Sequence, residues 1–594
     1  MAPEKLIHLQ PPYVLLENSL KPQHGGLLFE DPHAIIVANE TDEVKTAFDD
    51  ITNALNAKLQ HRLKSATPLL WFGVFKEKLS VTTEEIERWL EGRQRQEHIS
   101  EMPPLTIQPE ETFKDYQARF EKVKQAITAG DIYQLNLTFK AAIKNANPLA
   151  LYSKMRLAQP VEYASFINTG EETILSASPE LFIEKTECWI ETRPMKGTLK
   201  RGPTTRQDQH LSQSLKEDQK SRAENLMIVD RMRNDFGRIA EMGTVTVDEL
   251  FKVETFPSLH QMISIVRARQ KKDISLFEQM QALFPPGSIT GAPKIRAMEL
   301  IDDLEQSPRS IYTGAIGYFA PNTDYIFNVA IRTVRLDNKG TGEIGIGSGL
   351  VFDSDAKSEY EECLLKMKFL KSETPEFSLI ETIGYNPQKG LLYLEEHLSR
   401  LQNSAEYFAY ISDIYQIKQL LFNLVKDNPD HLRIRLLLQK NGSVSLTPTV
   451  IAPPESDLIW QIKLVNDPLH SENVFLYHKT TNRSFYDEAR VEAQKQFKAK
   501  MQADDKTPQL DEVIFQNERG ELTEGSITNL FIKKNGKLIT PPITSGLLCG
   551  TLRQSLIESG EVTEAVLYKH DLESADEIYV GNSVRGLIKA NLVK

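Results

Sequence analysis

Three acidic side chains of the first half stand on segments with a helical apolar pattern. Glu224 lies at the start of the apolar-rich run in RAENLMIVDRMRNDFGRIAE, and Glu359 and Glu362 lie three residues apart in DSDAKSEYEECLLKMKFL. On a helix, Glu359, Glu362 and Lys366 would share one face. Carboxylates without histidine or cysteine spacing suit Mg²⁺, a hard cation that takes oxygen donors. Taken singly, such carboxylates are more often solvated side chains or helix-start charges.

Glycines beside a predicted helix start offer a second kind of chemistry. In PPGSITGAPKIRAMELIDDLE, residues 285–305, Pro293 stands where a helix can begin, and apolar positions then recur at helical spacing. Gly287 and Gly291 leave backbone N–H groups open just before that helix, which would suit an anion. A tight turn followed by a capped helix would explain the same residues.

Length and composition limit what can position these groups. A chain of 594 residues suggests three or four domain-sized units, and 40% hydrophobic with 26% charged residues is typical of a soluble globular protein. The net charge of -12 argues against a nucleic-acid partner. No apolar stretch approaches the roughly 20 residues that span a bilayer, and we read no signal peptide. The three cysteines fit neither a zinc site nor a disulfide framework, so we expect a reducing cytoplasm.

Two polar stretches predict where the chain divides. Residues 371–376 separate the helix-like LLKMKFL from the strand-like FSLIETIGY, and Ala452–Ser456 separates SVSLTPTVI from DLIWQIKLV. The sequence therefore predicts about 370 residues of mixed α/β structure, a linker at 371–376, and about 220 residues in two smaller lobes.

Seven segments of the first half occur in one order across residues 176–362. They are SASPELFIE, ETRPMKGTLKRG, ENLMIVDRMRND, PPGSITGAPKIRAME, YTGAIGYF, NVAIRTVRL and GSGLVFDSDAKSEYEE. This closely resembles the chorismate-utilising enzymes, which include the anthranilate synthase large component, isochorismate and salicylate synthases, and aminodeoxychorismate synthase component I. The resemblance is strong over about 110–370 and weak before it. It implies an α+β fold with a two-sheet α/β sandwich in residues 1–370.

The resemblance also implies roles for individual residues of this half. Glu224 and Glu362 would hold Mg²⁺, with Glu359 contributing through water, and the metal would bind the ring carboxylate of chorismate. Glu180 would be the general acid that protonates the departing C4 hydroxyl, which requires a raised pKa. The other residues would bind the substrate: Tyr312, Arg332, Gly349 and Lys366 its carboxylates, and His260 and Thr290 its ring.

Lys196 and Gln134 distinguish between members of this family. The motif PMKGT resembles the PIKGT of aminodeoxychorismate synthase, whereas anthranilate synthases carry alanine in place of the lysine. The Lys196 amine could attack C2 of the ring as the C4 oxygen leaves, and ammonia would then displace the lysine and arrive at C4. Gln134 stands where water-using relatives carry a lysine base. Because glutamine cannot deprotonate water, amination is favoured over hydration.

The second half carries an ordered set of segments of its own. They are LYHKTTNRSFYDEAR, DEVIFQNERGELTEGSITNLFI, GLLCGTLRQSLIE and VGNSVRGL. Their order resembles the fold-type IV pyridoxal-phosphate (PLP) enzymes, which include aminodeoxychorismate lyase, branched-chain aminotransferase and D-amino-acid aminotransferase. The resemblance implies a two-lobed domain over 377–594, with sub-lobes at about 377–451 and 457–594. It is compatible with a homodimer formed through this half.

By this resemblance, Lys479 would carry PLP as a Schiff base, a role for an amine of lowered pKa. Glu524 would pair with the pyridine nitrogen of the cofactor. The cofactor phosphate would be held by Arg400, Ser526, Ile527, Gly550 and Thr551, and Asn529 would support the same site. Gly550 and Thr551 precede a helical pattern, and a helix N-terminus suits an anion.

Together the two resemblances predict a bifunctional enzyme of folate-precursor synthesis. The first half would convert chorismate and ammonia to 4-amino-4-deoxychorismate, and the second would eliminate pyruvate to give 4-aminobenzoate. No cysteine–histidine glutaminase segment is apparent, so we expect a separate glutamine amidotransferase subunit to supply ammonia. Three alternatives stay open: a fused fold-type IV aminotransferase, an anthranilate synthase (which Lys196 opposes), and an inactive scaffold for a glutaminase.

Overall fold

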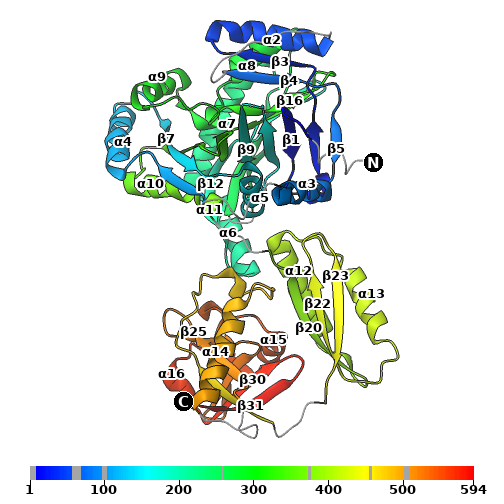
Figure 1. Ribbon diagram of the computed structural model, residues 1–594. Coiled ribbons are helices and arrows are strands. Elements are labelled where there is room, and N and C mark those ends of the chain that lie inside the picture. The colour runs from blue at the N-terminus through cyan, green and yellow to red at the C-terminus, as the bar shows by residue number, and fades with distance from the viewer. Residues whose placement is uncertain are drawn as a thin grey trace. The chain divides into compact units, whose positions relative to one another are not determined.

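The chain forms two compact units (Figure 1). Unit 1 comprises Met1–Lys200 and Ser212–Thr374, and unit 2 comprises Arg201–Leu211 and Pro375–Lys594. The computed structural model describes residues 9–56, 69–96, 104–256, 259–371, 376–453, 458–500 and 509–593. Most of the predicted linker, residues 372–375, lies outside this range. The membership of Arg201–Leu211 in unit 2 was not anticipated from the sequence.

The larger sheet of unit 1 has ten strands. Its order is β15 (Gly291–Ala292), β7 (Gln134–Lys144), β19 (Gly342–Leu350), β18 (Thr333–Asp337), β9 (Glu172–Ser178), β8 (Tyr163–Asn168), β1 (Tyr13–Glu17), β2 (Gly26–Phe29) and β5 (Leu79–Val81), with β6 (Thr106–Pro109) paired to β7. Strand β7 shows why the sheet has a core face. Its alternate residues from Leu135 to Ile143 are apolar and join one buried cluster, as the two-residue period of a strand requires.

The second sheet of unit 1 has seven strands. Its order is β12 (Met195–Lys200), β14 (Leu259–Arg269), β11 (Trp189–Thr192), β10 (Leu181–Thr186), β17 (Tyr325–Val329) and β16 (Ala315–Phe319), with β13 (Thr246–Thr255) paired to β14. Val14 and Ile167 of the larger sheet share a buried cluster with Ile316 of this one. The two sheets therefore pack against each other, as the predicted sandwich requires. Strands β3 (Ala34–Ala38) and β4 (Leu70–Val74) form a separate pair.

Helices cover the outer faces of the unit 1 sheets (Figure 1). The core of the larger sheet includes residues of α3 (Thr83–Gln96), α4 (Phe113–Thr128), α5 (Pro148–Ala158), α9 (Lys294–Leu304), α10 (Ala356–Leu365) and α11 (Lys368–Lys371). The core of the smaller sheet includes residues of α2 (Thr41–Asn56), α7 (Gln219–Ile239) and α8 (Leu276–Leu283). Helix α6 (Thr205–Glu217) begins within the Arg201–Leu211 segment.

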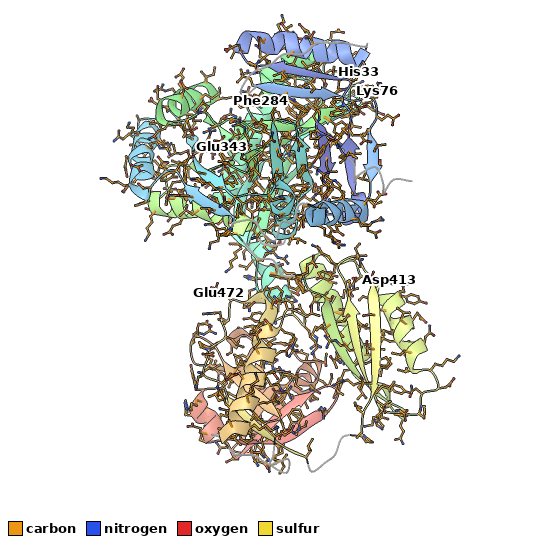
Figure 2. All side chains as sticks on the ribbon, in the orientation of Figure 1. His33, Lys76, Phe284, Glu343, Asp413 and Glu472 are labelled. Carbon is orange, nitrogen blue, oxygen red and sulfur yellow. The ribbon has the colours of Figure 1, made fainter. Side chains whose placement is uncertain are left out.

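Unit 2 contains two sheets, one before and one after the second predicted break at Ala452–Ser456. The smaller has the order β21 (Gly390–Leu391), β20 (Leu379–Asn386), β22 (Leu432–Leu438) and β23 (Val444–Val450), and packs on α12 (Leu394–Phe408) and α13 (Ile414–Val425). Helix α13 begins after Asp413, whose carboxylate accepts the N–H of Gln416 at 2.9 Å (Figure 2).

The larger sheet of unit 2 has eight strands. Its order is β26 (Leu522–Gly525), β25 (Glu512–Gln516), β24 (Ile459–Leu464), β31 (Gly586–Leu592), β30 (Glu577–Asn582), β27 (Asn529–Lys534), β28 (Lys537–Thr540) and β29 (Val562–Glu564). Helices α14 (Ser484–Lys500), α15 (Thr551–Glu558) and α16 (Lys569–Glu573) accompany it. Among the helices that the structure describes, none is long and apolar enough to cross a membrane.

Candidate active sites

A bulge in strand β12 carries Lys196. The pairing of β12 with β14 shifts register between Met195 and Thr198, so Lys196 lies where the ladder is irregular. Gly197 has a φ of 93°, which side chains other than glycine rarely adopt. Bulges re-aim side chains and are frequent next to active sites. The backbone of the Lys196 strand also contacts α7, since Asn225 donates to the Lys196 carbonyl at 3.4 Å.

Lys196, Gln134 and Gly349 converge from three strands. A Cβ atom added to Gly349 would lie 2.6 Å from the Lys196 Nζ and 2.9 Å from the Gln134 Nε2, so the ends of both side chains would have to shift to admit it. The Oε1 atom of Gln134 is buried and has no hydrogen-bond partner within the described part of the chain. Burial lowers the pKa of Lys196, while Glu224 opposes the shift and Lys366 adds to it. The structure thus brings together three residues that the sequence predicted for one site.

Glu180 faces the same space from the second sheet. Its backbone is fixed just before the first residue of β10, where its carbonyl accepts the N–H of Val329 at 3.0 Å. Burial raises the pKa of Glu180 to about 7, although a hydrogen bond with Ser288 and the charges of Lys196 and Arg332 act in the opposite direction. A carboxyl group with this pKa can hold a proton near neutral pH, as a general acid must.

Arg332 and Tyr312 lie near Glu180, and burial shifts the pKa of each side chain. Arg332 has a φ of 52°, in the left-handed region that non-glycine residues enter mainly at special sites. Burial lowers the pKa of Arg332 to about 10, with Glu180 opposing the shift. Burial also raises the pKa of Tyr312, so its hydroxyl stays protonated. The arginine fork and the tyrosine hydroxyl are suitable donors for a carboxylate.

The three carboxylates predicted to bind Mg²⁺ stand on α7 and α10. Glu224 lies inside α7 rather than at its start, because Asp218 caps that helix and accepts the N–H of Ser221 at 2.7 Å. Glu224, Glu359 and Glu362 all act on the charge of the Lys196 amine. In the described residues, no three carboxylate, histidine or cysteine side chains are close enough to hold one metal ion.

Lys366 occupies part of this site. Its Nζ atom is 2.7 Å from Glu362 and donates to the Gly347 carbonyl at 2.8 Å. Burial raises the pKa of Glu362, but the charge and hydrogen bond of Lys366 outweigh it and hold the pKa below its usual value. Glu359 accepts a hydrogen bond from Ser354 at 2.7 Å. The amine of Lys366 therefore stands where the sequence predicted a cation beside Glu362.

His260 and Thr290, predicted to line the ring site, are both buried. The His260 Nδ1 atom lies 3.0 Å from the Thr255 hydroxyl. Thr290 follows the short helix η3 (Gly287–Ile289), and its carbonyl accepts the N–H of Asn136 at 2.8 Å. Gly291 pairs with Leu135 as part of β15, and its carbonyl accepts a hydrogen bond from Arg231. Gly291 therefore joins the loop before α9 to β7.

Lys479 is held against strand β20 of unit 2. Its carbonyl accepts the N–H of Ile380 at 2.8 Å, and Thr481 donates to the Ser378 carbonyl at 2.9 Å. Burial lowers the pKa of Lys479 to about 8, and the charge of Arg400 adds to the shift. A substantial share of this amine is then neutral near pH 8, which attack on an aldehyde requires.

Glu524 is buried and accepts hydrogen bonds from three donors. It accepts from the Tyr486 hydroxyl at 2.7 Å, from the N–H of Leu548 at 3.0 Å and from the Asn529 amide at 3.1 Å. Burial raises the pKa of Glu524 to about 7, while the hydrogen bonds from Leu548 and Tyr486 and the charge of Lys479 oppose the shift. Asn529 therefore contacts Glu524, and its supporting role in the cofactor site stays a prediction.

The residues predicted to bind phosphate fall into two groups. Arg400 donates to the Cys549 carbonyl at 2.9 Å, next to Gly550, which caps α15, and Thr551, which begins it. Ser526 and Ile527 instead donate their backbone N–H groups to Glu512, each at 3.0 Å. Their part in holding a phosphate stays a prediction.

Comparison with known proteins gives the family. A model of the chorismate binding enzyme family matches residues 24–372. The chain belongs to the chorismate binding enzymes. Residues 378–593 match a second family, the class IV aminotransferases. The chain thus joins a chorismate binding enzyme to a class IV aminotransferase-type half, as the sequence predicted.

Relatives of the chorismate-binding half carry a consistent name. It is 38% identical over 299 residues to "Aminodeoxychorismate synthase" of Streptomyces pristinaespiralis, covering 48% of this chain and 41% of the relative. It is 36% identical over 297 residues to "Aminodeoxychorismate synthase component 1" of Bacillus subtilis (strain 168), covering 48% and 63%. The chain therefore spans about half the length of the curated relatives that it matches.

A solved structure shows the fold of the chorismate-binding half. The "putative 2,3-dihydroxybenzoate-specific isochorismate synthase, DhbC from Bacillus anthracis" is 19% identical, with a TM-score of 0.51, and covers 62% of this chain and 98% of its own. At this identity the likeness supports the fold of the first half, the mixed α+β sandwich, and nothing further.

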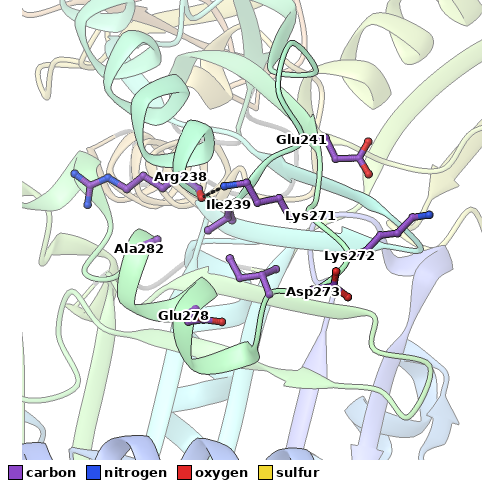
Figure 3. A pocket seen from close by; sticks show the side chains of 9 residues that line it. Arg238, Ile239, Glu241, Lys271, Lys272, Asp273, Glu278 and Ala282 are labelled. Atoms are coloured by element: carbon purple, nitrogen blue, oxygen red, sulfur yellow. Dashed lines mark hydrogen bonds between the residues drawn. The ribbon is translucent and has the colours of Figure 1, made fainter.

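Several residues at these sites were not predicted from the sequence. They are Ser288 beside Glu180, Tyr486 beside Glu524, and Glu512 beneath the 526–528 loop. A surface hollow at the end of α7 contains none of the predicted residues (Figure 3). It is lined by both acidic and basic side chains, and Lys271 donates to the Arg238 carbonyl across it at 2.7 Å.

Proposed function

We propose that the protein makes 4-aminobenzoate from chorismate and ammonia in two reactions, one in each unit. The chorismate-binding half would form 4-amino-4-deoxychorismate, and the class IV half would then eliminate pyruvate. The convergence of Lys196, Gln134 and Gly349 carries this proposal. It puts a partly buried amine of lowered pKa beside an amide that cannot act as a base toward water. Those two features favour amination.

In the first reaction, Glu180 donates its proton to the C4 oxygen of chorismate, and the C4–O bond breaks to release water. The neutral Lys196 amine forms a bond to C2 as the ring double bond shifts. Ammonia then forms a bond to C4, the double bond returns, and the bond between C2 and Lys196 breaks. The net change replaces a hydroxyl by an amino group. Arg332 and Tyr312 would hold a substrate carboxylate during both displacements.

Glu224, Glu359 and Glu362 would hold Mg²⁺ in this half. Their oxygen atoms suit a hard cation, and all three act on the charge of one amine, that of Lys196. When bound, the ion would supply positive charge for the ring carboxylate of the substrate. Lys366 would have to leave Glu362, to which it is paired at 2.7 Å, and could then bind a substrate carboxylate itself.

In the second reaction, PLP would supply an electron sink when bound. The residues present fit it: Lys479 is a partly buried amine with a pKa of about 8, and Glu524 is a buried carboxylate that can face the pyridine nitrogen. Arg400 and Thr551 would hold the phosphate. The neutral Lys479 amine would take the proton from C4 of the substrate ring, and pyruvate would leave as the ring becomes aromatic.

A separate glutamine amidotransferase would supply the ammonia. Relatives of the first half include proteins named as component 1 of aminodeoxychorismate synthase, a name that implies a second component. The second half could also form a homodimer. Co-purification with a glutaminase, and glutamine-dependent activity of the mixture, would test the amidotransferase partner.

Product analysis tests the proposed function. The protein incubated with chorismate, ammonium, Mg²⁺ and PLP should release 4-aminobenzoate and pyruvate. Pyruvate release without a keto-acid acceptor separates a lyase from an aminotransferase, and a fluorescent ortho-amino product would indicate an anthranilate synthase instead.

The variant Lys479→Ala tests whether two sites act in turn. It should consume chorismate at a rate within about twofold of wild type, because the first reaction does not use Lys479. Aminodeoxychorismate should accumulate and be visible by chromatography. A folded Lys479→Ala protein that no longer consumes chorismate would overturn the two-site proposal.

A further inference from the structure

A closed network of buried side chains lies behind Arg400 in unit 2. Glu381 comes from strand β20, and His397 and Arg400 come from helix α12. Ser583 lies between β30 and β31, and Thr551 begins α15. Glu381 and His397 are each only 1% exposed. Five side chains from separate parts of the unit therefore meet away from water.

Glu381 holds the Arg400 guanidinium by two parallel hydrogen bonds. Its Oε1 atom accepts from Nε at 2.9 Å, and its Oε2 atom accepts from Nη2 at 2.6 Å. Nη1 donates to the Cys549 carbonyl at 2.9 Å. A guanidinium has five N–H bonds, so one remains on each terminal nitrogen for a further acceptor. The two-point contact fixes the plane in which those N–H bonds lie.

The same carboxylate fixes the protonation of His397. Burial raises the pKa of Glu381, but Arg400 and His397 outweigh it and bring the pKa to about 2, so the carboxylate is ionised and can only accept. His397 Nδ1, which lies 2.6 Å from Oε2 of Glu381, must therefore carry a hydrogen. Burial also lowers the pKa of His397, which favours the neutral ring. Nε2 is then an acceptor.

Two hydroxyl groups compete for the single acceptor on His397. Nε2 lies 3.0 Å from the Ser583 hydroxyl and 3.4 Å from the Thr551 hydroxyl. The shorter distance assigns the hydrogen bond to Ser583. The Thr551 hydroxyl is then available as a donor to a group outside the network, beside the two remaining N–H bonds of Arg400.

We infer that Glu381 is the positioning residue of the phosphate site in unit 2, acting through both Arg400 and His397 without touching the anion. The Glu381 carboxylate orients the Arg400 guanidinium toward the anion. It also fixes His397 as an acceptor for Ser583, which leaves the Thr551 hydroxyl able to donate to the same anion. The inference rests on the proposed binding of PLP and names the cofactor's phosphate monoester as the ligand. It gives Ser583, from the VGNSVRGL segment, a part that the sequence alone did not assign.

Comparison of PLP with pyridoxal, which lacks the phosphate, tests this inference without an activity assay. The dissociation constant of each would be measured by absorbance titration of the full-length protein with substrate absent. Glu381→Gln should weaken PLP binding about 10- to 100-fold, the usual effect of losing a partner that orients a ligand-binding side chain. Pyridoxal binding should change less than about threefold, because Lys479 and Glu524 stay in place and the loss of the Glu381 charge only lowers the pKa of Lys479 further.

Two further variants complete the test. Glu395→Gln, on the α12 helix that also carries Arg400, removes an exposed carboxylate paired with Lys418. It should leave the dissociation constants of PLP and pyridoxal unchanged. Ser583→Ala should weaken PLP binding about threefold or more and spare pyridoxal, because the Thr551 hydroxyl would turn to His397. It remains informative if Glu381→Gln fails to fold.

The outcomes separate the inference from the proposed function. If wild type binds neither aldehyde, the PLP proposal itself fails. If wild type binds PLP and both Glu381→Gln and Ser583→Ala leave the ratio of the two constants unchanged, Glu381 does not position the phosphate site. An equal loss of PLP and pyridoxal binding in both variants would also overturn it, because it would indicate a general effect on the unit.

Discussion

Glu180 and Lys196 face one site, and burial shifts their pKa values toward each other. It raises the pKa of Glu180 to about 7 and lowers that of Lys196. A low-dielectric environment disfavours the charged form of each group. Those uncharged forms are the ones that the proposed reaction uses: a protonated acid at the C4 oxygen and a neutral amine at C2.

The pH dependence of chorismate consumption should report Glu180. Because its proton is lost as pH rises through about 7, kcat/KM for chorismate should fall above that pH when free ammonia is held constant. Glu180→Gln should lose roughly 10²- to 10⁴-fold in rate and show no decline near 7. A wild-type profile that is flat between about pH 6 and 8 would remove Glu180 from the role of acid.

Single residues differ in how far the sequence could predict them. Lys196 and Gly349 stand in the ordered motifs and Gln134 lies before them, and the structure brings the three together. Ser288 and Glu381 are polar residues of ordinary type, and only three-dimensional contacts give them a part. No spacing in the sequence indicates that a carboxylate on β20 will meet an arginine 19 positions later.

At the scale of elements, three strands of unit 1 supply the Lys196 site. β7 and β19 are neighbours in the larger sheet, where Gly349 pairs with Asn136, and β12 belongs to the second sheet. The sandwich therefore brings a lysine of one sheet against a glycine of the other. Apolar patterns predict strands of this kind, but the sequence does not give the order in which ten strands pair, because those contacts join distant residues.

Gly349→Ala tests that close approach. The added methyl carbon would lie 2.6 Å from the Lys196 Nζ, so the amine must move, and a displacement near 1 Å can cost about 10²-fold in rate. Chorismate turnover should fall by about that factor, measured with ammonium as nitrogen source. Gly237→Ala on α7 is the control, since its methyl would meet nothing within 4 Å. Normal turnover in Gly349→Ala would contradict the packing described for Lys196.

Helix boundaries show a smaller difference between sequence and structure. The sequence places Glu224 at a helix start, whereas α7 begins at Gln219 behind the Asp218 cap. The apolar run that marked the helix begins later than the helix itself, because the first turn of α7 is polar. For α9 and α15 the predicted starts, after Pro293 and at Gly550–Thr551, agree with the structure.

At the scale of the whole molecule, one segment belongs to a different compact unit from the residues that flank it in the sequence. Arg201–Leu211 follows the Lys196 strand in sequence but belongs to unit 2. There Arg201 pairs with Asp208 at 2.6 Å, donates to the Tyr407 carbonyl at 2.8 Å and stacks 3.8 Å from the Tyr407 ring. The Tyr407 ring in turn packs at 4.4 Å on His478, the residue before Lys479.

Arg201→Ala should therefore destabilise unit 2. Loss of one partner of a buried ion pair typically costs about 3–5 kcal/mol, because the other charge stays buried and uncompensated. Calorimetry of the full-length protein should show the unfolding transition of unit 2 at a lower temperature. That transition is identified as the one that PLP shifts upward in wild type but shifts less in Lys479→Ala. Arg206→Ala, an exposed position in the same segment, should have little effect. An unchanged transition in Arg201→Ala would mean that this segment does not stabilise unit 2.

The measurement that tests the central claim most directly is intact-protein mass spectrometry with chorismate and Mg²⁺ in the absence of ammonia. If Lys196 is the nucleophile, wild type and Lys479→Ala should both gain the mass of chorismate less water, and peptide mapping should locate it on Lys196. Lys196→Ala should gain nothing and should lose orders of magnitude in turnover. If Lys196→Ala makes 4-aminobenzoate at a near-normal rate, or if the adduct maps to another residue, the covalent role of Lys196 is wrong.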